Sequence, residues 1–417
     1  MSELNESQRK IAETTEGMIV VDAGPGTGKT TTMVERYAGI VSRPSVAARD
    51  VVMLTFTRNA AAEMAERAKK KLIEKGQADK CKELQASTFD SFCYTIVRES
   101  PETVSEFFGL KESLTRAAAI VENETLNGAF FSDVMDRFLA ERGDDYGDAA
   151  IVASQHYGDL LKLISKLMSR GIVPLKEGWF GSDLANVPMD KGSRILNGDT
   201  DGLEAFIRAL MAEFTDDEKK NIRTYDLNKR LKKDCLMDKN YVLPEIKDEE
   251  PLPEKDLESV VYDSDRKKML ELVHDAYYEF IRRSVAGDRL TFGLSAVFAF
   301  VILYSDRTVR EHMRCKYLMI DEFQDTNSSQ LMIALMLLEE PNLCVVGDWK
   351  QGIYGFRYVS VENITDFEAR VKAFKKLLNN GEERVVVPVD KTRKLTLDVN
   401  YRSSGLVLDA SFAALTM

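Results

Sequence analysis

Ala23-Gly24-Pro25-Gly26-Thr27-Gly28-Lys29-Thr30 begins at the end of the mainly apolar run Met18 to Ala23 and leads into a helical pattern over residues 29–42. A short apolar run that ends in glycines is typical of a buried strand in a parallel sheet. Glycines allow backbone N–H groups to turn toward phosphate oxygens, and the N-terminus of the next helix attracts anions. The stretch therefore predicts a strand, a phosphate-binding loop and a helix, in that order.

The polar side chains at the end of this loop have separate expected roles. Lys29 would reach the β- and γ-phosphates of ATP, and the Thr30 hydroxyl would bind Mg²⁺. The strict loop pattern has glycine where this chain has Ala23, so a glycine-rich turn with an incidental lysine is the alternative. The other expected nucleotide contacts are Gly24, Pro25, Gly26, Thr27 and Gly28.

A pair of acidic residues, Asp321 and Glu322, follows the apolar run Tyr317 to Ile320. A phosphate loop works together with an acidic site that holds the metal and orients water. We expect Asp321 to bind Mg²⁺ through water and Glu322 to activate the attacking water. A solvated strand end is the alternative when the pair is taken alone, and the presence of the phosphate loop favours the metal site.

The order of the predicted elements indicates an α/β fold with a parallel sheet. Val51 to Thr57 forms a second buried strand before a helical stretch at 59–75, and this alternation is typical of a doubly wound sheet. Helical periodicity dominates from about residue 98 to 290, which predicts a large helical insertion. The later predicted elements are strands at 317–320, 343–346, 384–390 and 394–399 and a helix at 362–378.

These elements divide the chain into three predicted parts. Residues 1–97 and 291–379 form the domain with the phosphate site, residues 98–290 form the insertion, and residues 380–417 open a second domain. Fewer than forty residues are too few to complete that last domain. We therefore expect the chain to be the N-terminal portion of a longer protein.

Composition excludes several classes of protein. With 44% apolar and 30% charged residues, the 417-residue chain is not disordered throughout, and no apolar run is long enough for a transmembrane helix. The first residues, MSELNESQRK, lack the apolar centre of a signal peptide. The five cysteines are scattered without a CxxC pair, which argues against a disulfide scaffold or a compact metal site. We expect an intracellular, cytoplasmic protein, nucleoid-associated in a prokaryote.

The formal net charge of −11 does not exclude a local groove for nucleic acid, because net charge averages over the whole surface. Much of the acidity lies in residues 245–265, which carry nine acidic and two basic side chains together with Pro251 and Pro253. This composition predicts an exposed linker, with an interaction tail as the alternative.

Further motifs occur in a fixed order along the chain. They are Leu4-Asn5-Glu6-Ser7-Gln8-Arg9, Leu54-Thr55-Phe56-Thr57 with Ala60-Ala61-Ala62-Glu63-Met64, Ser87-Thr88-Phe89-Asp90-Ser91-Phe92, Asp321-Glu322-Phe323-Gln324-Asp325-Thr326, Val346-Gly347-Asp348 with Gln351-Gly352-Ile353-Tyr354-Gly355-Phe356-Arg357, and Asn400-Tyr401-Arg402-Ser403. Together they resemble the UvrD/Rep family of superfamily one helicases, in which the phosphate loop usually begins with alanine. The resemblance implies two RecA-like motor domains, each with a helical insertion, and movement from 3′ to 5′ along single-stranded DNA.

The resemblance also implies roles around a nucleotide bound between the two motor domains. Gln8 would contact the adenine, and Tyr401 would lie near it. Gln351 would sense the γ-phosphate, and Arg402 would contact that phosphate from the second motor domain. Lys29, Glu322, Gln351 and Arg402 are thus the expected catalytic residues.

A single-stranded or tailed duplex DNA is the expected partner. Tyr354 and Phe356 are two positions apart beside a predicted strand end, and their rings could stack on successive bases at about 1–3 kcal/mol per base. Packing in the core is the alternative for such aromatic residues. The resemblance implies further DNA contacts at Thr57, Thr88, Phe89, Ser91 and Arg357.

The chain departs from the family pattern at several positions. Arg58-Asn59 stands where the family usually has Asn-Lys. Asp90 stands where the family usually has His, and the negative charge of Asp90 would repel a DNA phosphate. Downstream of Arg402 nothing resembles the last two family motifs, so the chain alone is expected to be weakly active or inactive.

Three functions stay open on the sequence. The first is an ATP-dependent helicase, or the helicase part of a RecB-like helicase–nuclease, serving DNA repair, recombination or replication restart. The second is an ATP-regulated DNA-binding module without motor activity. The third is a phosphate-loop ATPase that binds no nucleic acid. The intact ATP-site residues argue against the second function, and the aromatic residues in their motifs argue against the third.

Overall fold

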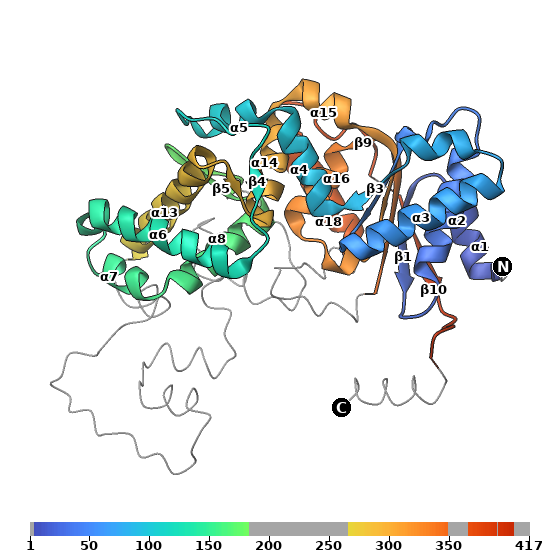
Figure 1. The fold of residues 1–417 in the computed structure, drawn as a ribbon, viewed down its shortest axis with the longest axis horizontal. Helices are drawn as coiled ribbons and strands as arrows, with labels where there is room; N and C mark the ends of the chain where they lie inside the picture. Colours follow the sequence, from blue (N-terminus) through green and yellow to red (C-terminus); the bar gives the residue numbers. More distant parts are fainter. Residues whose placement is uncertain (1–3, 183–265, 349–365, 390, 404–417) are drawn as a thin grey trace, which may run out of the picture.

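A six-stranded sheet forms the centre of the computed structural model, which describes residues 4–182, 266–348, 366–389 and 391–403 (Figure 1). The strand order is β10-β1-β9-β8-β2-β3, and every neighbouring pair runs parallel. The strands are β1 (Met18–Ala23), β2 (Val51–Thr55), β3 (Gln85–Thr88), β8 (Cys315–Ile320), β9 (Leu338–Gly347) and β10 (Thr392–Leu397). The predicted α/β class with a parallel sheet is confirmed.

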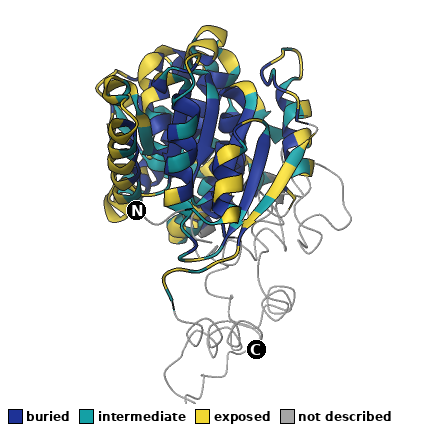
Figure 2. Cartoon of the chain, turned by 90° about the vertical axis from the view of Figure 1, so that its right-hand side faces the viewer, coloured by how far each residue is buried: buried dark blue, intermediate teal, exposed yellow. Residues whose placement is uncertain are grey.

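Helices cover both faces of this sheet, and the inner strands β1, β9, β8 and β2 are mostly buried between them (Figure 2). Successive side chains of a strand point to opposite faces. Ile19 and Val21 of β1 therefore join one core, beneath α1 (Glu6–Glu13), α2 (Lys29–Val41) and α3 (Arg58–Glu74). Met18 and Val20 join the other, whose helices are α4 (Phe89–Glu99), α14 (Phe292–Ser305), α16 (Ser328–Met336) and α18 (Phe367–Leu378).

A helical lobe extends from this second face, at the left of Figure 1. The described residues between 98 and 290 are mainly helical, as predicted, and the exact boundaries of the domains stay a prediction. The predicted linker at 245–265 lies outside the described residues. The elements of the lobe and its base are α5 (Pro101–Phe108), β4 (Ala119–Ile120), α6 (Glu124–Arg142), α7 (Asp148–Gln155), α8 (Tyr157–Arg170), β5 (Val173–Leu175), β6 (Gly178–Phe180), α13 (Arg266–Ala286), β7 (Arg289–Leu290) and α15 (Arg307–Met313).

Strand β10 lies in the central sheet, while the second domain expected from residue 380 stays a prediction. We expected the strand at 394–399 to lie in that domain, but β10 pairs with β1 along its whole length, from Met18 beside Thr392 to Ala23 beside Leu397. Leu397 is buried, whereas Arg393 and Lys394 are exposed. This partly exposed pattern suits the edge of a sheet.

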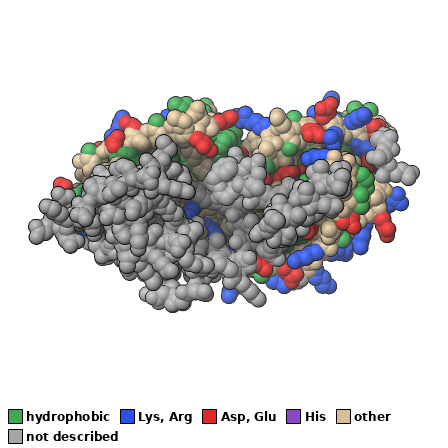
Figure 3. Space-filling view, turned by 90° about the horizontal axis from the view of Figure 1, so that it is seen from below, with side chains coloured by type: hydrophobic (Ala, Val, Ile, Leu, Met, Phe, Trp, Pro, Cys, Tyr) green, Lys and Arg blue, Asp and Glu red, His purple; other side chains and the backbone are tan. Residues whose placement is uncertain are grey.

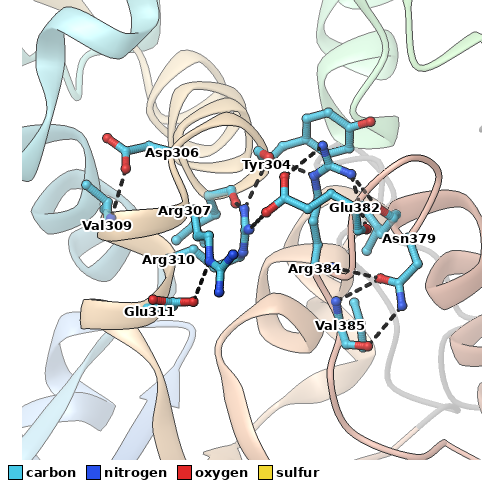
Figure 4. A network of polar contacts seen from close by, with 12 residues as sticks. Tyr304, Asp306, Arg307, Val309, Arg310, Glu311, Asn379, Glu382, Arg384 and Val385 are labelled. Atoms are coloured by element: carbon cyan, nitrogen blue, oxygen red, sulfur yellow. Dashed lines mark hydrogen bonds and ion pairs between the residues drawn. The ribbon is translucent and has the colours of Figure 1, made fainter.

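The predicted strand at 384–390 is also wrong, because the described residues 384–389 form no strand. Polar contacts hold this segment instead (Figure 4). The Arg384 guanidinium lies 3.6 Å above the centre of the Tyr304 ring and donates hydrogen bonds to the carbonyls of Tyr304 and Leu378, at 2.7 and 2.9 Å. The buried Arg310 belongs to the same network and forms an ion pair with Glu382. These contacts fix the path of the chain between α18 and β10.

Among the described helices, none is both long and apolar enough to span a membrane by itself; α14 and α15 satisfy the criteria only as a pair bent by 108°.

Candidate nucleotide site

Four loops meet at the carboxyl edge of the sheet, where parallel α/β folds commonly bind ligands. In the register of the sheet, Ala23 of β1 lies beside Leu397 of β10, and Ile320 of β8 lies beside Val345 of β9. The phosphate loop, the acidic pair Asp321–Glu322, Asp348 and the segment 400–403 therefore emerge next to one another. The sheet brings together residues that the chain separates by hundreds of positions.

The phosphate loop presents a row of unpaired backbone donors. Within the described part of the chain, the N–H groups of residues 26–31 have no hydrogen-bond acceptor. Gly26 and Gly28 have φ values of +71° and +82°, a left-handed backbone that favours glycine. Thr27 Oγ1 donates to the Gly24 carbonyl at 2.8 Å and closes the loop from inside. Such a row of N–H groups at the start of α2 suits an anion such as phosphate.

Lys29 lies against the acidic strand end. Its Nζ is 3.1 Å from Oε2 of Glu322, and both side chains are partly buried. Glu322 has φ of +50° and ψ of +43°, a left-handed conformation uncommon for a non-glycine residue. Backbone strain of this kind clusters at functional sites, which supports a role for this carboxylate.

The two carboxyl groups of the acidic pair have different surroundings. Burial, together with the neighbouring Glu322 carboxylate, raises the pKa of Asp321 to about 6, while the Glu322 N–H and Lys29 act in the opposite direction. The Glu322 N–H donates to Oδ1 of Asp321 at 3.0 Å. In the described residues, Oδ2 of Asp321 and the Thr30 hydroxyl have no partner. Oxygen donors of this type fit Mg²⁺, so both residues fit the expected metal site.

The expected adenine contacts lie on one side of the phosphate loop. Gln8 Nε2 donates to the Thr27 carbonyl at 3.0 Å, and Gln8 also forms a capping box with Asn5 at the start of α1. Asn5 Nδ2 donates to the Tyr401 hydroxyl at 2.7 Å. The structure therefore places Gln8, Tyr401 and the loop in one connected group.

Arg402 lies directly over the loop. A Cβ atom added to Gly26 would meet the Arg402 Cβ atom at 2.5 Å. Because Arg402 comes five residues after the end of β10, a strand of the first sheet places it there, and not a strand of a second domain.

The predicted DNA contacts are only partly described. Thr57 and Thr88 cap α3 and α4, with their hydroxyl oxygens accepting from the N–H groups of Ala60 and Ser91. Phe89 corrects a prediction: it is only 5% exposed and packs in the core beneath the sheet, so its ring is not available to a base. The first position of α4 directs this side chain inward. Gln351, Tyr354, Phe356 and Arg357 lie outside the described residues.

Two residues at the site were missed by the sequence analysis. Gln324 is buried; its Nε2 donates to Oε2 of Glu322 at 2.7 Å, and its Oε1 accepts from the Asp348 N–H at 2.9 Å. Asn400 Nδ2 donates to the Pro25 carbonyl at 2.5 Å. Both belong to the quoted motifs, and only their motif membership could have signalled a role, because the contacts of Gln324 with Asp348 and of Asn400 with Pro25 join distant parts of the chain.

Charges of both signs occur on one face of the described fold (Figure 3). On the face drawn in Figure 3, basic and acidic side chains of the described residues stand side by side. On that face, basic side chains are therefore present despite the net charge of −11 (Figure 3).

Comparison with known proteins agrees with this geometry. A family model described as the UvrD/REP helicase N-terminal domain matches residues 4–372. The chain is 23% identical to the ATP-dependent DNA helicase UvrD1 of Mycobacterium tuberculosis, over 98% of this chain and 38% of the relative. It is also 23% identical to the ATP-dependent DNA helicase PcrA of Staphylococcus aureus, over 99% of this chain and 40% of the relative. The chain thus spans about two fifths of these relatives, and it belongs to the UvrD/REP helicase family.

Proposed function

We propose that this chain binds and hydrolyses ATP as the first motor domain of a DNA helicase that moves 3′ to 5′ on single-stranded DNA. The observation that carries the proposal is the ion pair of Lys29 and Glu322 beside the N–H groups of residues 26–31, which have no acceptor among the described residues. A phosphate group needs the donors and the cation, and its hydrolysis needs a carboxylate within reach. The relatives' names, which specify ATP and DNA, support the same proposal.

Each polar group at the site has a proposed part in hydrolysis. Lys29 would leave Glu322 for the β- and γ-phosphates, which frees Glu322 to accept a proton from the attacking water. Gln324 would keep the Glu322 carboxylate in place, since it donates to the same oxygen as Lys29. Thr30 and Asp321 would hold Mg²⁺, which supplies positive charge against the phosphates. Arg402 and Gln351 would approach the γ-phosphate, and Gln8 and Tyr401 would bind the adenine.

The proposed DNA path crosses the carboxyl edge of the sheet. Thr57 and Ser91 are exposed at the ends of the adjacent strands β2 and β3. Together with Thr88, Tyr354, Phe356 and Arg357 they would contact single-stranded DNA or the tail of a duplex. Residues 98–290 would form the insertion of this motor domain. Strand separation is proposed for the whole protein, which would act inside the cell, at the nucleoid in a prokaryote.

The direct test is ATP hydrolysis by this chain, followed in single turnovers with and without single-stranded DNA. Because the chain alone is expected to be weakly active, the proposal predicts slow hydrolysis, measurable in single turnovers, that DNA accelerates and that Lys29→Ala abolishes. Lys316→Ala is the matched control, because Lys316 pairs with Asp50 at the far end of β8. ATP binding without hydrolysis would favour a DNA-binding module that ATP regulates. Hydrolysis with no DNA binding would favour a phosphate-loop ATPase that does not use nucleic acid.

A further inference from the structure

Two consecutive carbonyl groups of the phosphate loop are bonded from outside by two consecutive residues. Asn400 Nδ2 donates to the Pro25 carbonyl at 2.5 Å, and the Tyr401 N–H donates to the Gly26 carbonyl at 2.8 Å. The parallel pairing of β10 with β1 aligns the two segments, since Leu397 lies beside Ala23 at the last position of both strands. The segment that follows β10 therefore packs along the loop that follows β1.

The Asn400 side chain also shapes its own segment. Its Oδ1 accepts hydrogen bonds from the N–H groups of Arg402 and Ser403, both at 2.8 Å. An asparagine side chain can donate from its nitrogen and accept at its oxygen at the same time. Asn400 uses both ends, so one side chain fastens the segment to the loop and sets the backbone of the residues that follow.

The contact between loop and segment leaves no spare room. A Cβ atom on Gly26 would lie 2.5 Å from the Arg402 Cβ atom and 3.0 Å from Oδ1 of Asn400. From the other side, Asn5 Nδ2 donates to the Tyr401 hydroxyl at 2.7 Å, while the Tyr401 side chain stays 61% exposed. Both ends of Tyr401 are thus held, and its ring still faces the surroundings.

Holding these carbonyls fixes the direction of the loop's N–H groups. In a planar trans peptide, the C=O of one residue and the N–H of the next point in opposite directions. The Pro25 carbonyl shares its peptide plane with the Gly26 N–H, and the Gly26 carbonyl shares its plane with the Thr27 N–H. With both carbonyls directed toward segment 400–401, the two N–H groups are directed to the opposite side, where they have no acceptor in the described chain.

We propose that Asn400 is a positioning residue of the nucleotide site. It locks segment 400–403 onto the phosphate loop, orients the Gly26 and Thr27 N–H groups for phosphate, and holds Tyr401 and Arg402 beside them. The inference rests on the proposed function, because it takes the ligand of this loop to be a nucleotide. It adds that the loop and the segment form one preorganised unit.

The test compares two asparagines with similar local roles. Asn400→Ser keeps a side-chain oxygen at the turn and removes the amide donor to Pro25. Asn379→Ser is the matched control, because Asn379 Oδ1 also accepts from two N–H groups, those of Arg384 and Val385, and its Nδ2 donates to a carbonyl in the network of Figure 4. Both variants are titrated with a fluorescent ADP analogue and Mg²⁺, and amide hydrogen exchange is measured without nucleotide.

For Asn400→Ser, we expect a dissociation constant raised roughly three- to tenfold, in line with the loss of one hydrogen bond. We also expect faster exchange of the Tyr401 N–H, with exchange in β1 and β8 unchanged. Asn379→Ser should leave the dissociation constant and the Tyr401 exchange as in the wild type. Asn400→Asp, which keeps the acceptor and replaces the donor by a carboxylate, should weaken binding at least as much.

Several results would overturn the inference. The inference is wrong if Asn400→Ser binds the analogue as tightly as the wild type. It is also wrong if Tyr401 N–H exchange is unchanged in Asn400→Ser, even when no variant binds nucleotide. Faster exchange throughout the sheet would assign Asn400 a general structural role instead. Failure of the wild-type chain to bind the analogue would contradict the proposed function, and the exchange of Tyr401 would still decide whether Asn400 holds the segment to the loop.

Discussion

The ammonium group of Lys29 lies 3.1 Å from Oε2 of Glu322, although 293 residues separate the two along the chain. Lys29 opens α2 after β1, Glu322 follows β8, and β9 lies between these strands in the sheet. The contact joins the phosphate loop directly to the acidic strand end. A bound nucleotide would compete with Glu322 for the same ammonium group. Changes to these side chains should therefore separate nucleotide binding from hydrolysis.

Glu322→Gln should keep the binding of ATP and Mg²⁺ and slow hydrolysis by about 10²–10⁴-fold, because it removes only the group that accepts a proton from water. Single-turnover hydrolysis and a binding titration on the same preparation measure the two effects. Glu311→Gln, on the exposed surface of α15, is the control and should change neither. A collapse of nucleotide affinity in Glu322→Gln would assign Glu322 to binding and contradict this division of roles.

Mg²⁺-dependent nucleotide binding should weaken as the pH falls through about 6. Burial raises the pKa of Asp321 to about 6 from its ordinary value of 3.8, and only the ionised carboxylate binds the metal well. In the absence of metal, the free energy of unfolding should change with pH in the opposite direction to nucleotide binding. Asp321 stabilises the fold most below pH 3.8, and this contribution is lost as the pH rises through about 6.

A titration with an ADP analogue at several pH values, in wild type and in Asp321→Asn, measures this effect. Protonation of the nucleotide itself contributes equally to both proteins, so the difference between them reports Asp321. An identical pH dependence in the two proteins would show that Asp321 does not hold the metal.

Phe89→Ala should act on stability and not on DNA binding. The Phe89 side chain is buried in the core below the sheet, and truncating a buried phenylalanine typically costs about 3–5 kcal/mol of unfolding free energy. Chemical denaturation and DNA titration under conditions where the variant is folded distinguish the two roles. Unchanged stability with weakened DNA binding would place the ring at the DNA after all.

Tyr354→Ala and Phe356→Ala should each weaken binding of single-stranded DNA by about 1–3 kcal/mol, with little dependence on base sequence, because any base can stack on an aromatic ring. The salt dependence of binding should stay the same, since the neutralisation of phosphates by Lys and Arg sets it. A changed salt slope with unchanged affinity at low salt would indicate a phosphate contact instead of stacking.

The local features of this fold could be predicted from the sequence. The phosphate loop and its strand are encoded within a dozen residues, and the described strand and helix, Met18–Ala23 and Lys29–Val41, agree with the prediction. The acidic pair was recognisable because a short apolar run precedes it, and β8 ends at Ile320 as expected. In both cases the signal and the structure involve the same neighbouring residues.

The features that the sequence predicted wrongly, or did not predict, depend on contacts between distant parts of the chain. Strand β10 could pair with any exposed sheet edge, and its own residues do not encode that β1 is its neighbour. The inward direction of Phe89 depends on how α4 packs on the sheet. Gln324 and Asn400 also contact Asp348 and Pro25, which lie 24 and 375 residues away, and these contacts are not encoded locally. Contacts between distant residues therefore could not be predicted from the local sequence pattern.

The central claim, that this loop and its lysine form an ATP site, is tested most directly by titrating the wild-type chain, Lys29→Ala and Lys316→Ala with a fluorescent ATP analogue and Mg²⁺. We predict saturable binding to the wild type and to Lys316→Ala, and loss of that binding in Lys29→Ala with an unchanged unfolding temperature. Among the described residues, the Lys29 side chain has an ion pair with Glu322, and it belongs to neither of the two hydrophobic cores. Equal binding by Lys29→Ala and the wild type, or no binding by any of the three, would contradict the account.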